Sequence, residues 1–86
     1  VSRLNADIDG ELGKLRAGVD GRRNQLGGAT VGVIEKNLTV IDSAIAESRK
    51  AIVRDPASRF LIESLNQSLE SKVELLRVAA ALPGRS

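Results

Sequence analysis

Two long segments with helical periodicity, separated only by Asp55 and Pro56, constrain this chain more than any other feature of its sequence. Apolar side chains recur every three or four positions over about residues 29–54 and again over about residues 56–82. Proline disfavours helical backbone at the preceding residue but suits the first helical position, and aspartate can cap a helix. We therefore expect one helix to end near Arg54 and the next to begin at Pro56. Because the joint is so short, the two helices should form a long antiparallel helical hairpin.

The N-terminal third of the chain predicts a weaker helix, over about residues 2–26. Its apolar residues also recur at helical spacing, but they form only a narrow stripe. Four glycines fall inside this segment, and each costs up to about 1 kcal/mol relative to alanine in a helix interior. These glycines are Gly10, Gly13, Gly18 and Gly21. We expect this helix to be the least stable element, joined to the hairpin by the flexible pair Gly27-Gly28.

These patterns predict an all-α fold in which residues 1–86 form a single domain with three helices, as a three-helix bundle or a coiled-coil-like assembly. The apolar content of 42% consists almost wholly of Leu, Ile, Val and Ala, which suits interdigitating helices. Segment 29–54 has an apolar arc of about half its circumference, wider than a helix with one neighbour needs. We therefore expect it to be the middle helix, touching both of the others.

The residue types that the chain lacks exclude most catalytic and metal sites. Without cysteine or histidine there is no thiol nucleophile, no imidazole base and no ordinary zinc or copper site. The acidic residues lack the spacing of a calcium loop, and the glycines lack the Lys-Ser/Thr element of a phosphate-binding loop. We therefore predict no enzyme activity, no catalytic residue, no cofactor and no metal ligand. Basic and acidic residues are interspersed, with a net charge of +2, so we expect no nucleic-acid binding either.

Two basic residues, Arg22 and Lys72, occupy positions where the helical pattern expects apolar side chains. We interpret them as structural rather than as an anion site. Their stems would cover apolar surface while their charged ends reach water. For Lys72 a second interpretation is a polar contact that fixes the register of the hairpin, level with Asn37 and Leu38.

Four apolar residues lie off the predicted hairpin seam and are our candidates for a partner-binding surface. Two of them project about 160° from the centre of the apolar face of segment 56–82, at 100° per residue. The other two belong to a second apolar row on segment 29–54. The four residues are Val33, Val40, Phe60 and Val78. We expect self-association as a two-fold homodimer to cover them, with the N-terminal helix packed either on its own hairpin or on that of the partner.

Residues 33–77, VIEKNLTVIDSAIAESRKAIVRDPASRFLIESLNQSLESKVELLR, resemble a known family. The pattern ExNLxxIDxAIAExRxA followed by a hydrophobic residue spans Glu35 to Ile52. A second, DPxxx-hydrophobic-L, spans Asp55 to Leu61, and a third, K-hydrophobic-xLLR, spans Lys72 to Arg77. In these features the chain is similar to the extracytoplasmic segment of membrane-anchored, zinc-finger-type anti-sigma factors of bacteria. It departs from the family in having Gly27-Gly28 where an Asp-Pro dipeptide usually begins the first helix of the hairpin.

The resemblance implies a function and a location. The parent protein would hold a sigma factor with an N-terminal cytoplasmic zinc domain, cross the inner membrane once, and place this region on the extracytoplasmic side. The chain begins without methionine and carries neither zinc ligands nor a span, so we expect it to be a piece of that longer protein. It would sense or oligomerise, with a protein partner or a protease outside the membrane. The alternative is a coiled-coil adaptor or dimerisation module unrelated to sigma factors.

Overall fold

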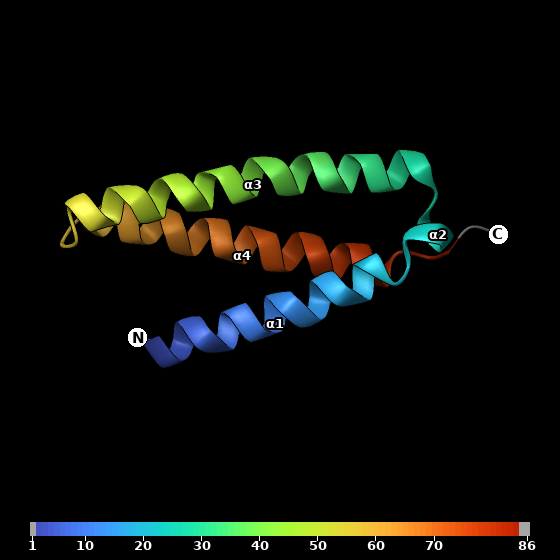
Figure 1. Ribbon diagram of the computed structural model, residues 1–86, viewed down its shortest axis with the longest axis horizontal. Coiled ribbons are helices and arrows are strands. Elements are labelled where there is room, and N and C mark those ends of the chain that lie inside the picture. The colour runs from blue at the N-terminus through green and yellow to red at the C-terminus, as the bar shows by residue number, and fades with distance from the viewer. Residues whose placement is uncertain (1, 85–86) are drawn as a thin grey trace.

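The computed structural model describes residues 2–84, and the side chains of residues 8–84; residues 1, 85 and 86 of the predicted domain lie outside this range. The described residues form four helices: α1 (Ser2–Asp20), α2 (Arg23–Leu26), α3 (Gly28–Arg54) and α4 (Arg59–Ala81). No β-strand occurs among residues 2–84. Figure 1 shows α3 and α4 side by side as a long antiparallel pair, so the predicted all-α fold with a helical hairpin is confirmed.

The core of the hairpin consists of aliphatic side chains that the helical period brings to one side of each helix. Leu76 of α4 is fully buried, and Leu38 of α3 is only 3% exposed. Beside this core, Lys72 Nζ lies 2.6 Å from Asp42 Oδ1 on the facing helix, and this polar contact marks the register of the hairpin. The buried core residues of the described chain are Leu12, Val19, Leu26, Ile34, Leu38, Ile45, Leu69, Leu76 and Ala79.

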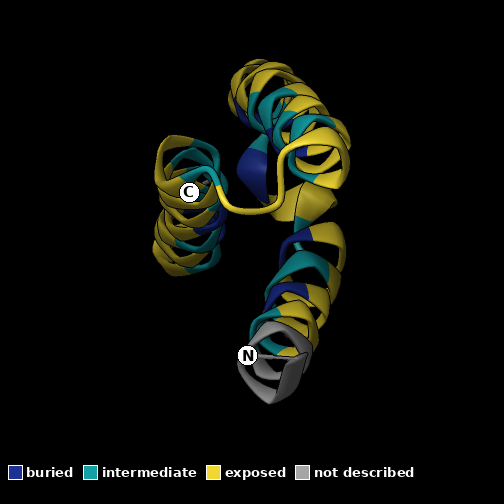
Figure 2. Cartoon of the chain, turned by 90° about the vertical axis from the view of Figure 1, so that its left-hand side faces the viewer, coloured by how far each residue is buried: buried dark blue, intermediate teal, exposed yellow. Residues whose placement is uncertain are grey.

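The middle helix is α4, and our expectation for segment 29–54 is wrong in this respect. Both α3 and α1 pack along α4, whereas α3 makes its other main contact only with the short α2. The apolar arc of α4 is itself wide enough for two neighbours, because Leu69 and Val73 extend it toward α1. The end-on view in Figure 2 shows α1 on one side of the α3–α4 pair.

We expected one continuous helix over about residues 2–26, but the structure divides this segment into two helices. Helix α1 ends at Asp20, Gly21 and Arg22 form a turn, and α2 adds a single helical turn. The chain then enters α3 through Gly27, whose backbone has φ 81° and ψ 151°. This conformation is open essentially only to glycine, since any side chain would clash with the backbone. The corner between α2 and α3 therefore depends on Gly27.

The turn of the hairpin also differs from the prediction at one point. Asp55 is the C-cap of α3, and its N–H donates to the carbonyl oxygen of Ala51 at 3.0 Å. Helix α4 begins at Arg59 rather than at Pro56, because the Oγ of Ser58 accepts a hydrogen bond from the Leu61 N–H at 3.3 Å. Serine is a favoured N-cap, so it competes successfully with the Asp-Pro signal three residues earlier.

Candidate functional site

The four predicted partner-binding residues are all exposed on the hairpin. Phe60 is 75% exposed, Val40 65%, Val33 62% and Val78 49%. Phe60 and Val78 lie near opposite ends of α4, so the four residues form an elongated surface rather than a pocket. Sequence reasoning did not single out Val53 and Ile62, two further exposed apolar residues near the turn.

The helical period places these residues on the side of the hairpin that faces away from α1. Phe60 and Val78 each lie nine residues from Leu69, which together with Ile8 of α1 lines a groove, so both point about 180° from that contact. On α3, Val33 and Val40 point about 140–160° from Glu35, which binds Arg16 of α1. Small residues continue both rows. We call this surface the back face, and it comprises Val33, Val40, Ala44 and Ala51 of α3 with Phe60, Ser64, Ser71 and Val78 of α4.

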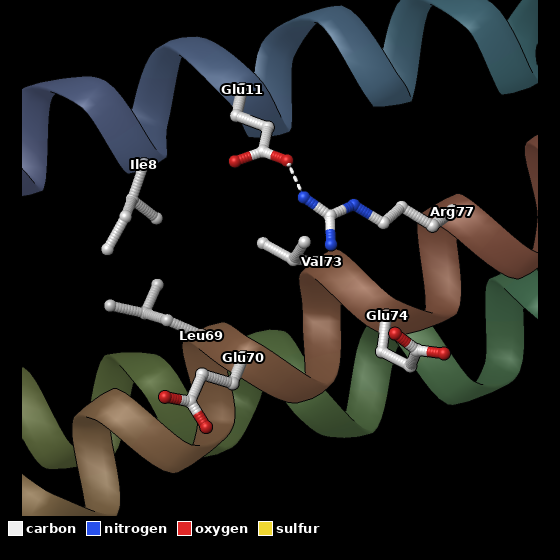
Figure 3. Close-up of a pocket in the computed structure, with 7 residues that line it drawn as sticks. All are labelled: Ile8, Glu11, Leu69, Glu70, Val73, Glu74 and Arg77. Carbon is white, nitrogen blue, oxygen red and sulfur yellow. Dashed lines mark hydrogen bonds and ion pairs between the residues drawn. The ribbon is translucent and has the colours of Figure 1, made fainter.

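On the opposite side, α1 and α4 enclose a shallow groove of about 310 Å³ (Figure 3). Ile8 and Leu69 point toward one another across it, with Val73 beside them. Glu11 and Arg77 form an ion pair over this apolar contact. Glu70 and Glu74 extend from α4 at the rim. The groove is a seam between two helices, and the residues lining it carry no hydroxyl, thiol or imidazole group.

A small network of charges fixes α1 and α2 to the start of α3. The Nη2 atom of Arg16 donates to both carboxylate oxygens of Glu35, at 3.0 and 3.2 Å. Arg23 of α2 binds the same carboxylate, and Asp20 lies 3.5 Å from Arg16 and 3.4 Å from Arg23. All four side chains are at least a third exposed, so each pair stabilises the fold only weakly, and the network mainly orients the corner.

We expected the charged end of Arg22 to reach water, but the structure shows it bound to backbone carbonyl oxygens of its own chain. Its guanidinium group donates hydrogen bonds to the carbonyl oxygens of Ala79, at 3.3 Å, Ala80 and Leu82. These carbonyls belong to the end of α4, where the last helical turn has no further N–H groups to bind. A cation is also favoured there by the helix dipole. Arg22 therefore caps α4 from the turn between α1 and α2.

For Lys72, the second of our two interpretations describes the contact. Its ammonium group binds the carboxylate of Asp42 on the facing helix, and its side chain is 22% exposed. We expected Lys72 to lie level with Asn37 and Leu38, but its partner is Asp42, so the register of the hairpin is shifted by about one helical turn. No buried side-chain nitrogen or oxygen among the described residues lacks a hydrogen-bond partner. Arg22 and Lys72 are thus both occupied by their own chain.

Within residues 2–84 no helix is both long enough and apolar enough to cross a membrane. Among the described side chains, no three carboxylates or other ligating groups gather as a metal site would require. No protein-family model matches the chain, and comparisons with curated proteins and with solved structures find no match. Among the described residues, the feature that indicates an interaction site is the back face, with its four exposed apolar side chains.

Proposed function

We propose that this chain is a non-catalytic, self-associating region of a membrane-anchored anti-sigma factor and lies on the extracytoplasmic side of the bacterial inner membrane. The structural support for self-association is the back face, on which four large apolar side chains stay exposed along both helices of the hairpin. Large exposed apolar surfaces on small proteins commonly mark interaction sites. The sigma-factor role rests on the resemblance of residues 33–77.

A second copy of the chain is the simplest partner for this surface. A short chain buries a limited fraction of its surface, so partner subunits commonly supply stability. A two-fold interface uses the same patch on both subunits, so a single interface would cover the four exposed apolar residues of each subunit. Because α1 packs on the opposite side of the hairpin, in its own chain, it does not obstruct such a contact.

In a membrane-anchored parent, a dimer of this region would hold two cytoplasmic domains side by side. A protein or protease outside the membrane that opened the dimer would change that spacing. The region would then transmit a signal without chemistry of its own, which agrees with the lack of cysteine and histidine.

The coding sequence upstream of Val1 tests the sigma-factor assignment. We expect it to encode one membrane span, preceded by a histidine- and cysteine-containing zinc motif. A reading frame with neither feature would contradict the assignment and favour a dimerisation module unrelated to sigma factors. Self-association is tested separately, by the solution mass.

A further inference from the structure

The two long edges of the back face carry opposite charges. At 100° per residue, the outer edge of α3 beside the back face carries three basic residues and one acidic residue. The corresponding edge of α4 carries three acidic residues together with Arg59 at its turn end and Arg77, whose charge is paired with Glu11, so the net charges of the two edges are opposite. We call these the basic edge, formed by Lys36, Lys50 and Arg54 with Glu47, and the acidic edge, formed by Glu63, Glu70 and Glu74. Among the described residues, none of these seven side chains forms an ion pair with its own chain.

The back face also has shallow hollows that lie at the same position along the helix axes as some of its projecting side chains. Counting outward from the Lys72–Asp42 contact, Ala51 lies level with Glu63, and Val40 lies level with Glu74. A shallow hollow on α3, lined by Glu47, Lys50, Ala51 and Arg54, is therefore nearly level with Phe60. A second hollow on α4, lined by Gln67, Glu70, Ser71, Glu74 and Leu75, is level with Val40. Phe60 and Val40 thus each have a recess at about their own height on the other helix.

We infer that two copies of this chain pack back face to back face around a two-fold axis parallel to the helices, with α3 of each copy against α4 of the other. This inference rests on the self-association proposed above and names its geometry. A rotation about such an axis keeps every residue at its own level. It therefore brings Phe60 to the hollow on the α3 of the partner copy, and Val40 to the hollow on its α4. The basic edge of each copy then lies along the acidic edge of the other.

The alternative two-fold arrangement matches neither the projecting side chains with the hollows nor the basic edge with the acidic edge. An axis perpendicular to the helices and within the interface would place α3 on α3 and α4 on α4, running in opposite directions. The basic edge would then face a second basic edge, and the acidic edge a second acidic edge. Like charges at the rim of an interface disfavour that orientation, since electrostatic complementarity selects register and orientation more than it adds affinity.

The parallel arrangement has a consequence for the chain ends. Figure 1 shows the N-terminal end of α1 toward the same end of the molecule as the hairpin turn. In the parallel dimer both α1 helices would start toward that same end. In the opposed arrangement they would start toward opposite ends of the assembly.

Spin-label distances in the dimer test the geometry. Since the chain has no cysteine, Ala57→Cys in the exposed hairpin turn and Ala29→Cys at the exposed start of α3 each give one labelled site. In the parallel dimer both sites should give distances of roughly 20–30 Å, a few interhelical spacings plus the label arms. The opposed dimer would separate them by close to the 50 Å length of the chain. Long distances in a sample whose mass is that of a dimer would overturn the geometry and leave self-association standing, whereas a monomeric mass would overturn both.

Charge reversal provides a second test, because the two geometries predict changes of the dimer Kd in opposite directions. In the parallel dimer, Lys36→Glu should raise the dimer Kd roughly three- to tenfold, because two surface attractions become repulsions. Glu74→Lys in the same chain should restore the affinity. Lys14→Glu, on an exposed position of α1, makes the same charge change away from the back face and should leave the Kd within about twofold of wild type. A lower Kd for Lys36→Glu, or no rescue by Glu74→Lys, would overturn the pairing of α3 with the partner's α4.

Discussion

The guanidinium group of Arg22 donates a hydrogen bond to the carbonyl oxygen of Ala79, 57 residues further along the chain, at 3.3 Å. The same side chain also binds the carbonyls of Ala80 and Leu82, so one residue of the turn after α1 closes the end of α4. This contact ties the N-terminal segment to the hairpin at a point where α4 would otherwise fray.

Replacing Arg22 with alanine should destabilise the fold by about 1–2 kcal/mol, since hydrogen bonds to charged groups contribute in this range and this side chain is half-buried. The loss should appear as a lower denaturant midpoint and as faster amide exchange in the last turn of α4. Arg22→Lys keeps the charge but not the planar fork, and should recover only part of the loss. An unchanged midpoint for Arg22→Ala would show that water caps α4 equally well.

Removing the hydroxyl of Ser58 tests which residue begins α4. Ser58→Ala should cost about 1 kcal/mol, the usual cost of losing an N-cap side chain. Asp55→Ala is the matched control and should change the free energy of unfolding by only a few tenths of a kcal/mol, because among the described residues the Asp55 side chain caps neither helix. Thermal unfolding of both variants measures the two losses of stability. A larger loss of unfolding free energy for Asp55→Ala would show that Asp55, and not Ser58, caps the start of α4.

Adjacent glycines at the corner before α3 should respond oppositely to alanine. Gly27→Ala forces a side chain into a glycine-only conformation and should destabilise the protein by about 1–3 kcal/mol. Gly28 is the first residue of α3, and a Cβ atom there would meet no other atom within 4 Å, so Gly28→Ala should be neutral or stabilising by up to about 1 kcal/mol. Chemical denaturation of the two variants measures the difference. Equal effects would mean that the corner does not depend on the backbone of Gly27.

Helix α1 should open more readily than the hairpin. Amide hydrogen exchange should be faster in α1 than in α3 and the central part of α4, because α1 contains interior glycines and packs mainly on one neighbour. Added Cβ atoms at Gly10, Gly13 and Gly18 would meet nothing within 4 Å. Alanine at all three positions should therefore slow exchange in α1 by stabilising it up to about 1 kcal/mol per site. Equal protection of α1 and the hairpin in the wild-type chain would contradict this ranking.

The hairpin was predictable from the sequence because its signal is local: apolar residues at helical spacing and a joint too short for any other connection. The exposure of Phe60 and Val78 followed from the same periodicity. The cap by Arg22 could not be derived in this way, since its partners lie at the far end of the chain and become neighbours only after α4 has folded back. The one local sign was a basic residue in an apolar stripe.

The position of α4 between α1 and α3 was missed for a related reason. The width of an apolar arc shows how many neighbours a helix can have, and both long helices have arcs wide enough for two. Which arc receives α1 depends on the corner at Gly27 and on pairs such as Glu11 with Arg77, neither of which has a periodic signal. The N-cap at Ser58 was not predicted, because the Asp-Pro pair three residues earlier carries a start signal of the same kind.

Solution mass as a function of concentration tests the central claim, self-association through the back face, most directly. Light scattering should show a dimer for the wild-type chain. Phe60→Glu with Val78→Glu should shift the mass to that of a monomer with nearly unchanged helix content. Val53→Glu is the matched control, because Val53 is 82% exposed but lies off the back face, and this variant should remain dimeric. At a concentration of roughly 1 mM, a dimer with a binding free energy of only about 4 kcal/mol would already be visible. A wild-type chain that is strictly monomeric at this concentration would contradict the claim.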